Sequence, residues 1–496
     1  MNLTVKHLAA AIAMTLILYS ESTFAQLPGW NYRSPITITE TDGVAKTDYP
    51  VRIIIKTRNL VNSGKVHKNG NDLRFADSCA SNILNHYIES GVGTDTTVVW
   101  VRLPSLPANS SVDLFMYYGN STAASGSKAG KTFDNPYITK SASQTLSGTK
   151  VYDYVLIKST DTLFIKAGSK LTIDSARWVV VNGHIKGEGR GNQPSTTNFA
   201  DGTGTGKGTA STGSNAGAGG GGYGGAGGDG GYDSGDDRGV GGKTYGTEMK
   251  DDIAMGSSGG NGSGPGAAGG GCLEINSDFI LVNGVINMNG DSATSASSGG
   301  QLGGGGSGGG VKINGHRVIV NGSVTADGGA GGDGAGTAND SGGGGGGGRI
   351  KIFYDEFLRM NGTTSATGGD GGIYGSAATG QDGLAGTVYT SDTTTGTKPD
   401  SVTSKLGTEQ AMIFSATSSD ADLVGCEDDT VTITALSGFK NYNFYFNGSL
   451  VTQTSSNSHD FYLGKSGDVL KVAVAYNTCI DLVDSFIFGV FPKPTI

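Results

Sequence analysis

The segment SGGGGGGGRIKIFYDE, Ser341–Glu356, joins seven consecutive glycines directly to a run with the composition of a β-strand. The glycines alone would fit a flexible linker. However, glycines followed by an apolar strand recur at residues 269–290 and 308–329, and a further copy of the strand begins at Leu171. Because a linker does not need such a repeat, we interpret each glycine run as the return segment of a coil, continuous with the strand that follows it.

The repeat is anchored on an Asn-Gly pair. The pair occurs at Asn182-Gly183, Asn283-Gly284, Asn321-Gly322 and Asn361-Gly362. Apolar residues recur three positions and one position before each asparagine, as the inward side chains of stacked strands should. The pair suits a tight turn because asparagine tolerates positive φ and glycine adopts it freely. The sequence therefore predicts a glycine-rich β-solenoid over residues 150–395, with the four turns stacked along one edge and their amides hydrogen-bonded between coils.

Most of the 88 glycines lie between residues 187 and 390, where no Gly-x-y period is present and proline is scarce. This pattern excludes collagen. Segments without Cβ atoms can pack backbone against backbone in polyproline-II-like geometry, and the region is similar to glycine-rich domains that form bundles of polyglycine helices. The longest insertion, residues 187–271, fits either such a bundle or a solvated loop, because ordering glycine costs much entropy.

Residues 1–25 have the features of a secretory signal: Lys6 near the start, an apolar run over Leu8–Tyr19, and small residues near Ala25. The run is too short to span a bilayer, and no later segment is long enough, so we expect an exported chain at the outer cell surface or outside the cell. The net charge of −9 argues against binding to nucleic acid. The cysteines and histidines have no zinc-site spacing, and we expect neither a metal nor a cofactor.

Residues 26–135 alternate apolar and polar residues in short runs, which predicts a β-sandwich. Five motifs occur in order: Trp30–Arg33, Tyr49–Val51, Asp72–Phe75, Trp100-Val101 and Tyr117–Asn120. In these motifs the segment resembles a bacterial exported domain known as domain of unknown function 2341. The resemblance implies a concanavalin-type jelly roll in a large surface protein, and it implies no particular ligand.

The aromatic residues of this segment are candidates for a glycan-binding platform. Trp100 lies within an apolar strand, where core packing is the favoured interpretation. Core packing is also the simpler explanation for the others. The candidate ligand-binding residues are Trp30, Tyr32, Tyr117 and Tyr118.

Residues 409–490 return to strand-like runs, including Cys426–Ile433, Tyr442–Gly448 and Gly467–Val472. They resemble the Ig-like and PKD-like modules of Bacteroidetes surface proteins. That resemblance implies a disulfide between Cys426 and Cys479, and we expect Cys79 and Cys272 to be free. Taken together, the sequence predicts an all-β chain: a jelly-roll sandwich, a glycine-rich solenoid and an Ig-like sandwich.

One column of the repeat carries titratable groups five positions before each asparagine: Arg177, Asp278, His316 and Glu356. A solvated charge ladder is the favoured interpretation. We therefore expect a non-enzymatic protein with an adhesive or structural role, whose partners would be extracellular polysaccharides or cell-surface components. Because β-helices also carry polysaccharide lyases and hydrolases, the alternative is a carbohydrate-active enzyme that uses this column.

Overall fold

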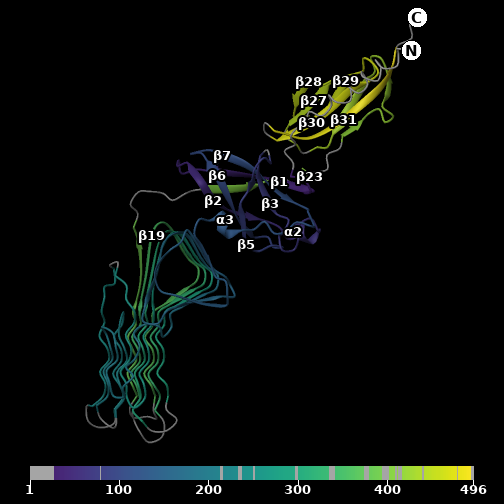
Figure 1. Cartoon of the computed structure of the whole chain (residues 1–496). Coiled ribbons are helices and arrows are strands. Elements are labelled where there is room, and N and C mark those ends of the chain that lie inside the picture. Colours follow the sequence, from purple (N-terminus) through teal and green to yellow (C-terminus); the bar gives the residue numbers. More distant parts are fainter. Residues whose placement is uncertain are drawn as a thin grey trace, which may run out of the picture. The chain divides into compact units, whose positions relative to one another are not determined.

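The structure, a computed structural model, is almost entirely β, as the sequence predicts (Figure 1). It describes residues 27–78, 80–212, 216–232, 237–249, 252–295, 300–334, 341–373, 379–393, 402–407, 410–411, 416–437, 439, 441–476 and 479–492. The predicted signal peptide and Cys79 lie outside these residues. The chain divides into two units, one formed by Phe133–Pro399 and one by the residues before and after it.

The N-terminal part is a sandwich of two antiparallel sheets with one shared apolar core. One sheet contains β2 (Lys46–Ile55), β6 (Thr97–Leu106) and β5 (His86–Ser90). The other contains β1 (Tyr32–Glu40), β7 (Ser111–Tyr118), β3 (Arg74–Asp77), β4 (Ile83–Leu84), β22 (Val402–Leu406) and β23 (Gln410–Ala411). Two short helices, α2 (Arg58–Asn62) and α3 (Ala129–Thr132), complete this part.

An unexpected feature of this sheet is that its edge is completed from beyond the solenoid. The strand β22 pairs with β1 in antiparallel register, from Ile36 opposite Leu406 to Glu40 opposite Val402. Gln410 and Ala411 pair with the start of the same strand. The sequence predicted no strand of the N-terminal sandwich there. The solenoid is thus inserted in sequence between parts of one sheet.

The solenoid consists of two parallel sheets, which four of the coils join at Asn-Gly turns. In order of pairing, the first sheet contains β21 (Thr387–Asp392), β19 (Arg349–Met360), β17 (Gly310–Val320), β15 (Cys272–Val282), β13 (Lys170–Val181), β11 (Tyr154–Ile157) and β8 (Pro136–Ile138), and β10 (Gly148–Val151) also pairs with β13. The second contains β20 (Thr363–Ser365), β18 (Ser323–Thr325), β16 (Val285–Asn287), β14 (His184–Lys186), β12 (Thr162–Ile165) and β9 (Ser143–Leu146). Two coils thus precede the first Asn-Gly pair.

The four Asn-Gly turns stack as one edge of the solenoid. Val181 pairs directly with Val282, so the long insertion adds no coil between the first two turns. The Nδ2 atom of Asn283 donates to Oδ1 of Asn182 at 2.8 Å, and the amides of Asn321 and Asn361 continue the ladder at 2.9 Å each. The predicted amide ladder is therefore present.

The reason given above for glycine in these turns is wrong. All eight turn residues are described, and none of them has a positive φ. The requirement is for space between coils. A Cβ atom on Gly284 would lie 1.9 Å from the carbonyl oxygen of Gly183, and one on Gly322 would lie 1.9 Å from that of Gly284. Glycine is needed because each turn rests on the backbone of the turn below.

The ladder predicts unequal effects for two alanine substitutions. Asn321→Ala removes two side-chain hydrogen bonds, whereas Asn361→Ala at the end of the ladder removes one. We expect Asn321→Ala to lower the free energy of unfolding by about 1–2 kcal/mol and Asn361→Ala to lower it by about half that value. The reason is that a hydrogen bond makes a net contribution of about 1 kcal/mol. Chemical denaturation of the two variants measures the difference. Equal losses, or no loss at Asn321, would contradict a role of the ladder in stability.

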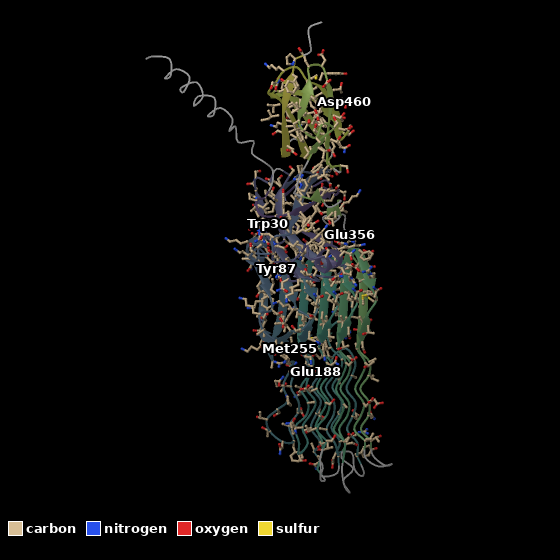
Figure 2. All side chains as sticks on the ribbon, turned by 90° about the vertical axis from the view of Figure 1, so that its right-hand side faces the viewer. Trp30, Tyr87, Glu188, Met255, Glu356 and Asp460 are labelled. Atoms are coloured by element: carbon tan, nitrogen blue, oxygen red, sulfur yellow. The ribbon has the colours of Figure 1, made fainter. Side chains whose placement is uncertain are left out.

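Beyond the strands, the glycine segments lie side by side as extended, wavy chains (Figure 1). Figure 2 shows that the side chains crowding the strands become sparse beyond Glu188 and Met255. Backbone hydrogen bonds link these segments with a period of three residues, the period of a polyproline-II helix. Described parts of the insertion 187–271 belong to the same arrangement, which resolves the choice between bundle and loop for them.

The heptaglycine run lies at the centre of this lattice. From Gly342 to Gly348, every backbone N–H donates to another segment and every carbonyl accepts from another segment. Successive residues form hydrogen bonds with different neighbouring segments, and every third residue bonds to the same segment. The hydrogen-bonded neighbours are residues 218–221, 225–228, 305–308, 326–332, 369–372 and 381–387. The interpretation of the run as a packed return segment is confirmed.

The C-terminal part is a second sandwich. Its sheets contain β24 (Ala416–Ser418), β26 (Thr430–Ala435) and β29 (Ser458–Tyr462), and β25 (Val424–Cys426), β31 (Cys479–Phe491), β30 (Asp468–Tyr476), β27 (Asn441–Phe446) and β28 (Ser449–Thr454). The apolar core joins residues of both sheets.

The disulfide between Cys426 and Cys479 is not supported by this sandwich. Cys426 lies opposite Phe491 at one end of the 13-residue strand β31, and Cys479 begins the other end. At about 3.3 Å per residue the two backbones are roughly 40 Å apart, whereas a disulfide needs Cα atoms within about 7 Å. Cys426 is a free, exposed cysteine. The pairing implied by the resemblance is therefore wrong.

Candidate functional site

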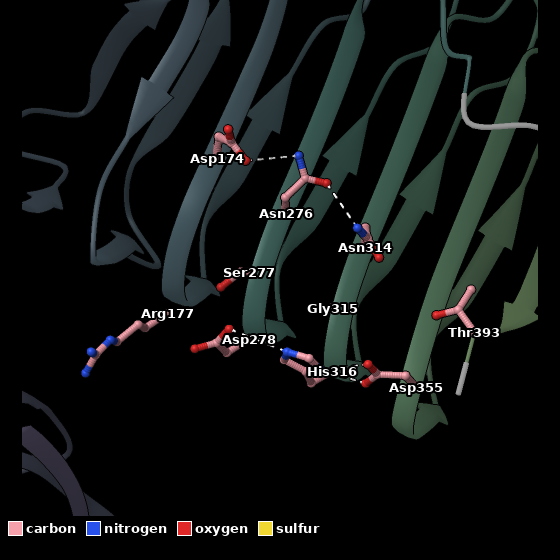
Figure 3. Close-up of a pocket in the computed structure, with 10 residues that line it drawn as sticks. All are labelled: Asp174, Arg177, Asn276, Ser277, Asp278, Asn314, Gly315, His316, Asp355 and Thr393. Carbon is pink, nitrogen blue, oxygen red and sulfur yellow. Dashed lines mark hydrogen bonds and ion pairs between the residues drawn. The ribbon is translucent and has the colours of Figure 1, made fainter. Parts of the chain in front are cut away.

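A polar groove of about 510 Å³ crosses the outer surface of four successive coils. It follows the bend of the long strands β13, β15, β17 and β19 (Figure 3). At this bend the alternation of inward and outward residues changes phase: Ile275 and Ile280 on β15, five positions apart, are both buried in the core. The bend therefore brings polar side chains to the surface in register from coil to coil.

The centre of the groove is His316. Its Nδ1 lies 2.7 Å and 2.8 Å from the two carboxylate oxygens of Asp355, and its Nε2 lies 3.8 Å from Oδ1 of Asp278. Because a carboxylate accepts hydrogen bonds, the contact with Asp355 orients the imidazole ring and leaves its Nε2 facing Asp278. The side chain of His316 is 34% exposed, so solutes can reach it.

One wall of the groove is a second column of polar residues. The Nδ2 atom of Asn276 donates to Oδ1 of Asp174, and that of Asn314 donates to Oδ1 of Asn276, both at 3.4 Å. Figure 3 shows this column running across the coils beside His316 and Asp278. The groove is thus bordered by acceptors and donors that alternate along the solenoid axis.

The structure changes the membership of the titratable column. Arg177, Asp278 and His316 line the groove, and the side chain of Arg177 points away from Asp278 (Figure 3). Asp355, not Glu356, accompanies His316, because a register shift follows Gly315 in the pairing of β17 with β19. Glu356 instead lies 3.8 Å from Arg317. Single-sequence alignment on the asparagine could not detect this bulge.

A neighbouring column shows what a purely structural charge ladder looks like here. Glu274 forms ion pairs with Lys170 and, at 2.9 Å, with Lys312. Burial opposes the charge on Glu274, but the hydrogen bonds from both lysines outweigh it and lower its pKa to about 2. The nearby thiol of Cys272 is buried, which raises its pKa to about 12 and makes it an unreactive core group.

Two of the four aromatic candidates in the N-terminal sandwich are wrong. Tyr117 and Tyr118 are fully buried, so neither can contact a ligand. Strand β7 is covered on both faces, with Tyr118 in the main core and Tyr117 against Phe115 and Leu27. Trp100 is also buried, as the favoured core interpretation of it requires.

Trp30 and Tyr32 lie nearer the surface but are engaged. The indole N–H of Trp30 donates to the backbone carbonyl of Asp72 at 2.6 Å. Tyr32 borders a pocket of about 270 Å³. One face of its ring stacks on Tyr118 at 5.6 Å, and the ammonium group of Lys65 lies 4.7 Å from the ring centroid. A sugar could stack on Tyr32 only after displacing Lys65.

Residues 69–154 match a family model described as a domain of unknown function (DUF2341). The match covers much less than half of the chain, and it starts later and ends later than the motifs noted above. Its last residues reach β11, beyond the N-terminal sandwich. No curated protein and no solved structure matches the chain.

Two features are absent from the described residues. None of the helices there has the length and apolar composition needed to cross a membrane. Likewise, no group of three or more His, Cys, Asp or Glu side chains within the described ranges could hold a metal ion.

Proposed function

We propose that this chain is an exported protein of the cell surface or extracellular space, with an adhesive or structural role. The observation that supports this role best is the glycine lattice. Its central run is hydrogen-bonded to six neighbouring segments and carries no side chains. Such an element provides stiffness and little chemistry, because its polar groups are consumed by its own backbone. We infer that it serves as a rigid body on which the coils present a binding surface.

The flanking parts fit the same role. We interpret the N-terminal sandwich as a concanavalin-like jelly roll and the C-terminal sandwich as an Ig-like or PKD-like module of the kind found in Bacteroidetes surface proteins. Both interpretations rest on sequence motifs and on the antiparallel sheets. Extracellular polysaccharides are the proposed ligands of the adhesive role. Export rests on the signal-like features of residues 1–25.

A second candidate function, a polysaccharide lyase or hydrolase, is favoured by one observation. A histidine whose Nδ1 is held by a carboxylate is the arrangement in which imidazole acts as a general base. Against this function, the other acidic side chain facing His316 is that of Asp278, at 3.8 Å, and the Arg177 side chain points away from Asp278 (Figure 3). The pair of His316 and Asp355 is equally suited to form a hydrogen bond with a hydroxyl group.

The two functions predict different products from the same incubation. We expect the mature chain to be retained on at least one immobilised polysaccharide in a glycan array, without turnover. Turnover is measured as new reducing ends or as absorbance from unsaturated products. If the wild-type chain released either product and a folded His316→Ala variant did not, the enzymatic function would replace the adhesive one.

A further inference from the structure

The groove at His316 has the geometry of a site for a linear polymer. It crosses four parallel strands, so its direction is that of the solenoid axis, and successive coils place polar side chains about 4.8 Å apart. Two polar columns border it, one led by Asn276 and Asn314 and one by Asp278 and His316. A chain lying along the axis would meet a donor or acceptor on each coil, which suits a ligand with its own short repeat.

The charges and hydrogen-bonding groups of the groove restrict the ligand. Asp174, Asp278 and Asp355 are opposed by one arginine, Arg177, so the lining has an excess of negative charge. This charge disfavours anionic polymers such as polyuronates and nucleic acids. Carboxylates, amides and an imidazole match hydroxyl groups, which donate and accept in turn. The chemistry therefore favours a neutral polyhydroxyl chain.

A row with three aromatic residues runs beside the polar columns on the same strands. The register places Trp178, Phe279, Arg317 and Phe357 opposite one another from coil to coil. The rings of Trp178 and Phe279 lie 4.4 Å apart, and Phe357 is 37% exposed. Sugar rings carry C–H surfaces as well as hydroxyl groups. A polar groove with an apolar margin is the combination that recognises both.

We propose that this groove binds a neutral polysaccharide laid along the solenoid axis. Asp355 fixes the ring of His316 so that its Nε2 can form a hydrogen bond with a hydroxyl group, and the amides of Asn276 and Asn314 hold hydroxyl groups on the neighbouring coils. The inference rests on the proposed adhesive function, and it moves the binding surface from the N-terminal aromatics to the solenoid.

The test compares three variants of the mature chain. One removes both groove amides, Asn276→Ala with Asn314→Ala. A control, Arg359→Ala, alters an exposed residue of β19 outside the groove. The third, Tyr32→Ala with Lys65→Ala, disables the N-terminal pocket. Binding is measured by affinity electrophoresis in soluble β-glucan and galactomannan, with alginate and polygalacturonate as anionic probes, and circular dichroism checks the folding of each variant.

We expect the wild-type chain and the Arg359 and N-terminal variants to be retarded by a neutral polysaccharide, and the groove variant to bind at least about tenfold more weakly. Retardation by the anionic probes alone would overturn the inference. It would also fall if only the N-terminal variant lost binding, an outcome that leaves the adhesive role intact. Failure of the wild-type chain to bind any of the four polymers would count against both proposals.

Discussion

Replacing Gly344 and Gly346 with valine should destabilise the solenoid by about 3 kcal/mol or more, the upper end of the usual cost of overpacking a core. A Cβ atom on Gly344 would lie 2.0 Å from the carbonyl oxygen of Gly369, and one on Gly346 would lie 2.2 Å from that of Gly225. Both obstacles are backbone atoms, which cannot turn aside as the end of a side chain can. The two positions also face different neighbours, so the strain cannot be relieved by moving one segment.

The measurement is the melting of the variant by differential scanning calorimetry, where the transition of the solenoid should shift to lower temperature. Proteolysis near Arg349 should also become faster. Gly264→Val is a matched control, because its Cβ would meet nothing within 4 Å and its φ is not positive. We expect the free energy of unfolding of the control to lie within about 0.5 kcal/mol of the wild-type value. If the Gly344 and Gly346 variant did the same, the run would have to be regarded as a linker.

The parts of the fold that could be predicted are those whose sequence pattern repeats along the chain. The Asn-Gly pairs gave the register of four coils because their spacing, hydrogen bonding and apolar flanks recur together. The two earlier coils could not be found in this way. Their turns follow Ile138 and Ile157 and contain no Asn-Gly pair, and the first coil begins at Pro136, before the predicted solenoid boundary.

Features that depend on contacts distant in sequence were missed. The alternation of β7 indicated that Tyr117 and Tyr118 face opposite sides, but not that Leu27 covers the second side. Similarly, the column of charges led to Glu356 because a bulge cannot be read from one sequence. The groove itself results from a bend repeated in each coil. No particular residue type marks a bend in a strand. Its only signal in the sequence is the break in the alternation of apolar and polar residues between Ile275 and Ile280.

Removal of the strand β22 should strongly destabilise the N-terminal sandwich. A fragment of residues 27–135, which the sequence alone would define as a complete module, should be less stable by about 3–5 kcal/mol than one that also carries residues 402–411 on a flexible tether. Without residues 402–411, the backbone hydrogen bonds to β1 between Ile36 and Glu40 are lost. Each of them makes a net contribution of about 1 kcal/mol to the free energy of unfolding. The bare edge of β1 would also offer unpaired backbone groups to a second copy, so the short fragment should aggregate.

The tethered fragment allows the pairing itself to be tested. Gly407 donates its backbone N–H to the carbonyl of Pro35, and hydrogen-bonded pairs alternate along antiparallel strands, so Lys405 faces Thr37 in the next such pair. Lys405→Pro removes that donor from an exposed position and should abolish most of the gain, whereas Lys405→Ala should keep it. Urea denaturation of the four fragments measures the free energies of unfolding. If the short fragment matched the tethered one, or if the proline and alanine variants were equal, β22 would be an incidental neighbour of β1, and the sandwich would be complete without it.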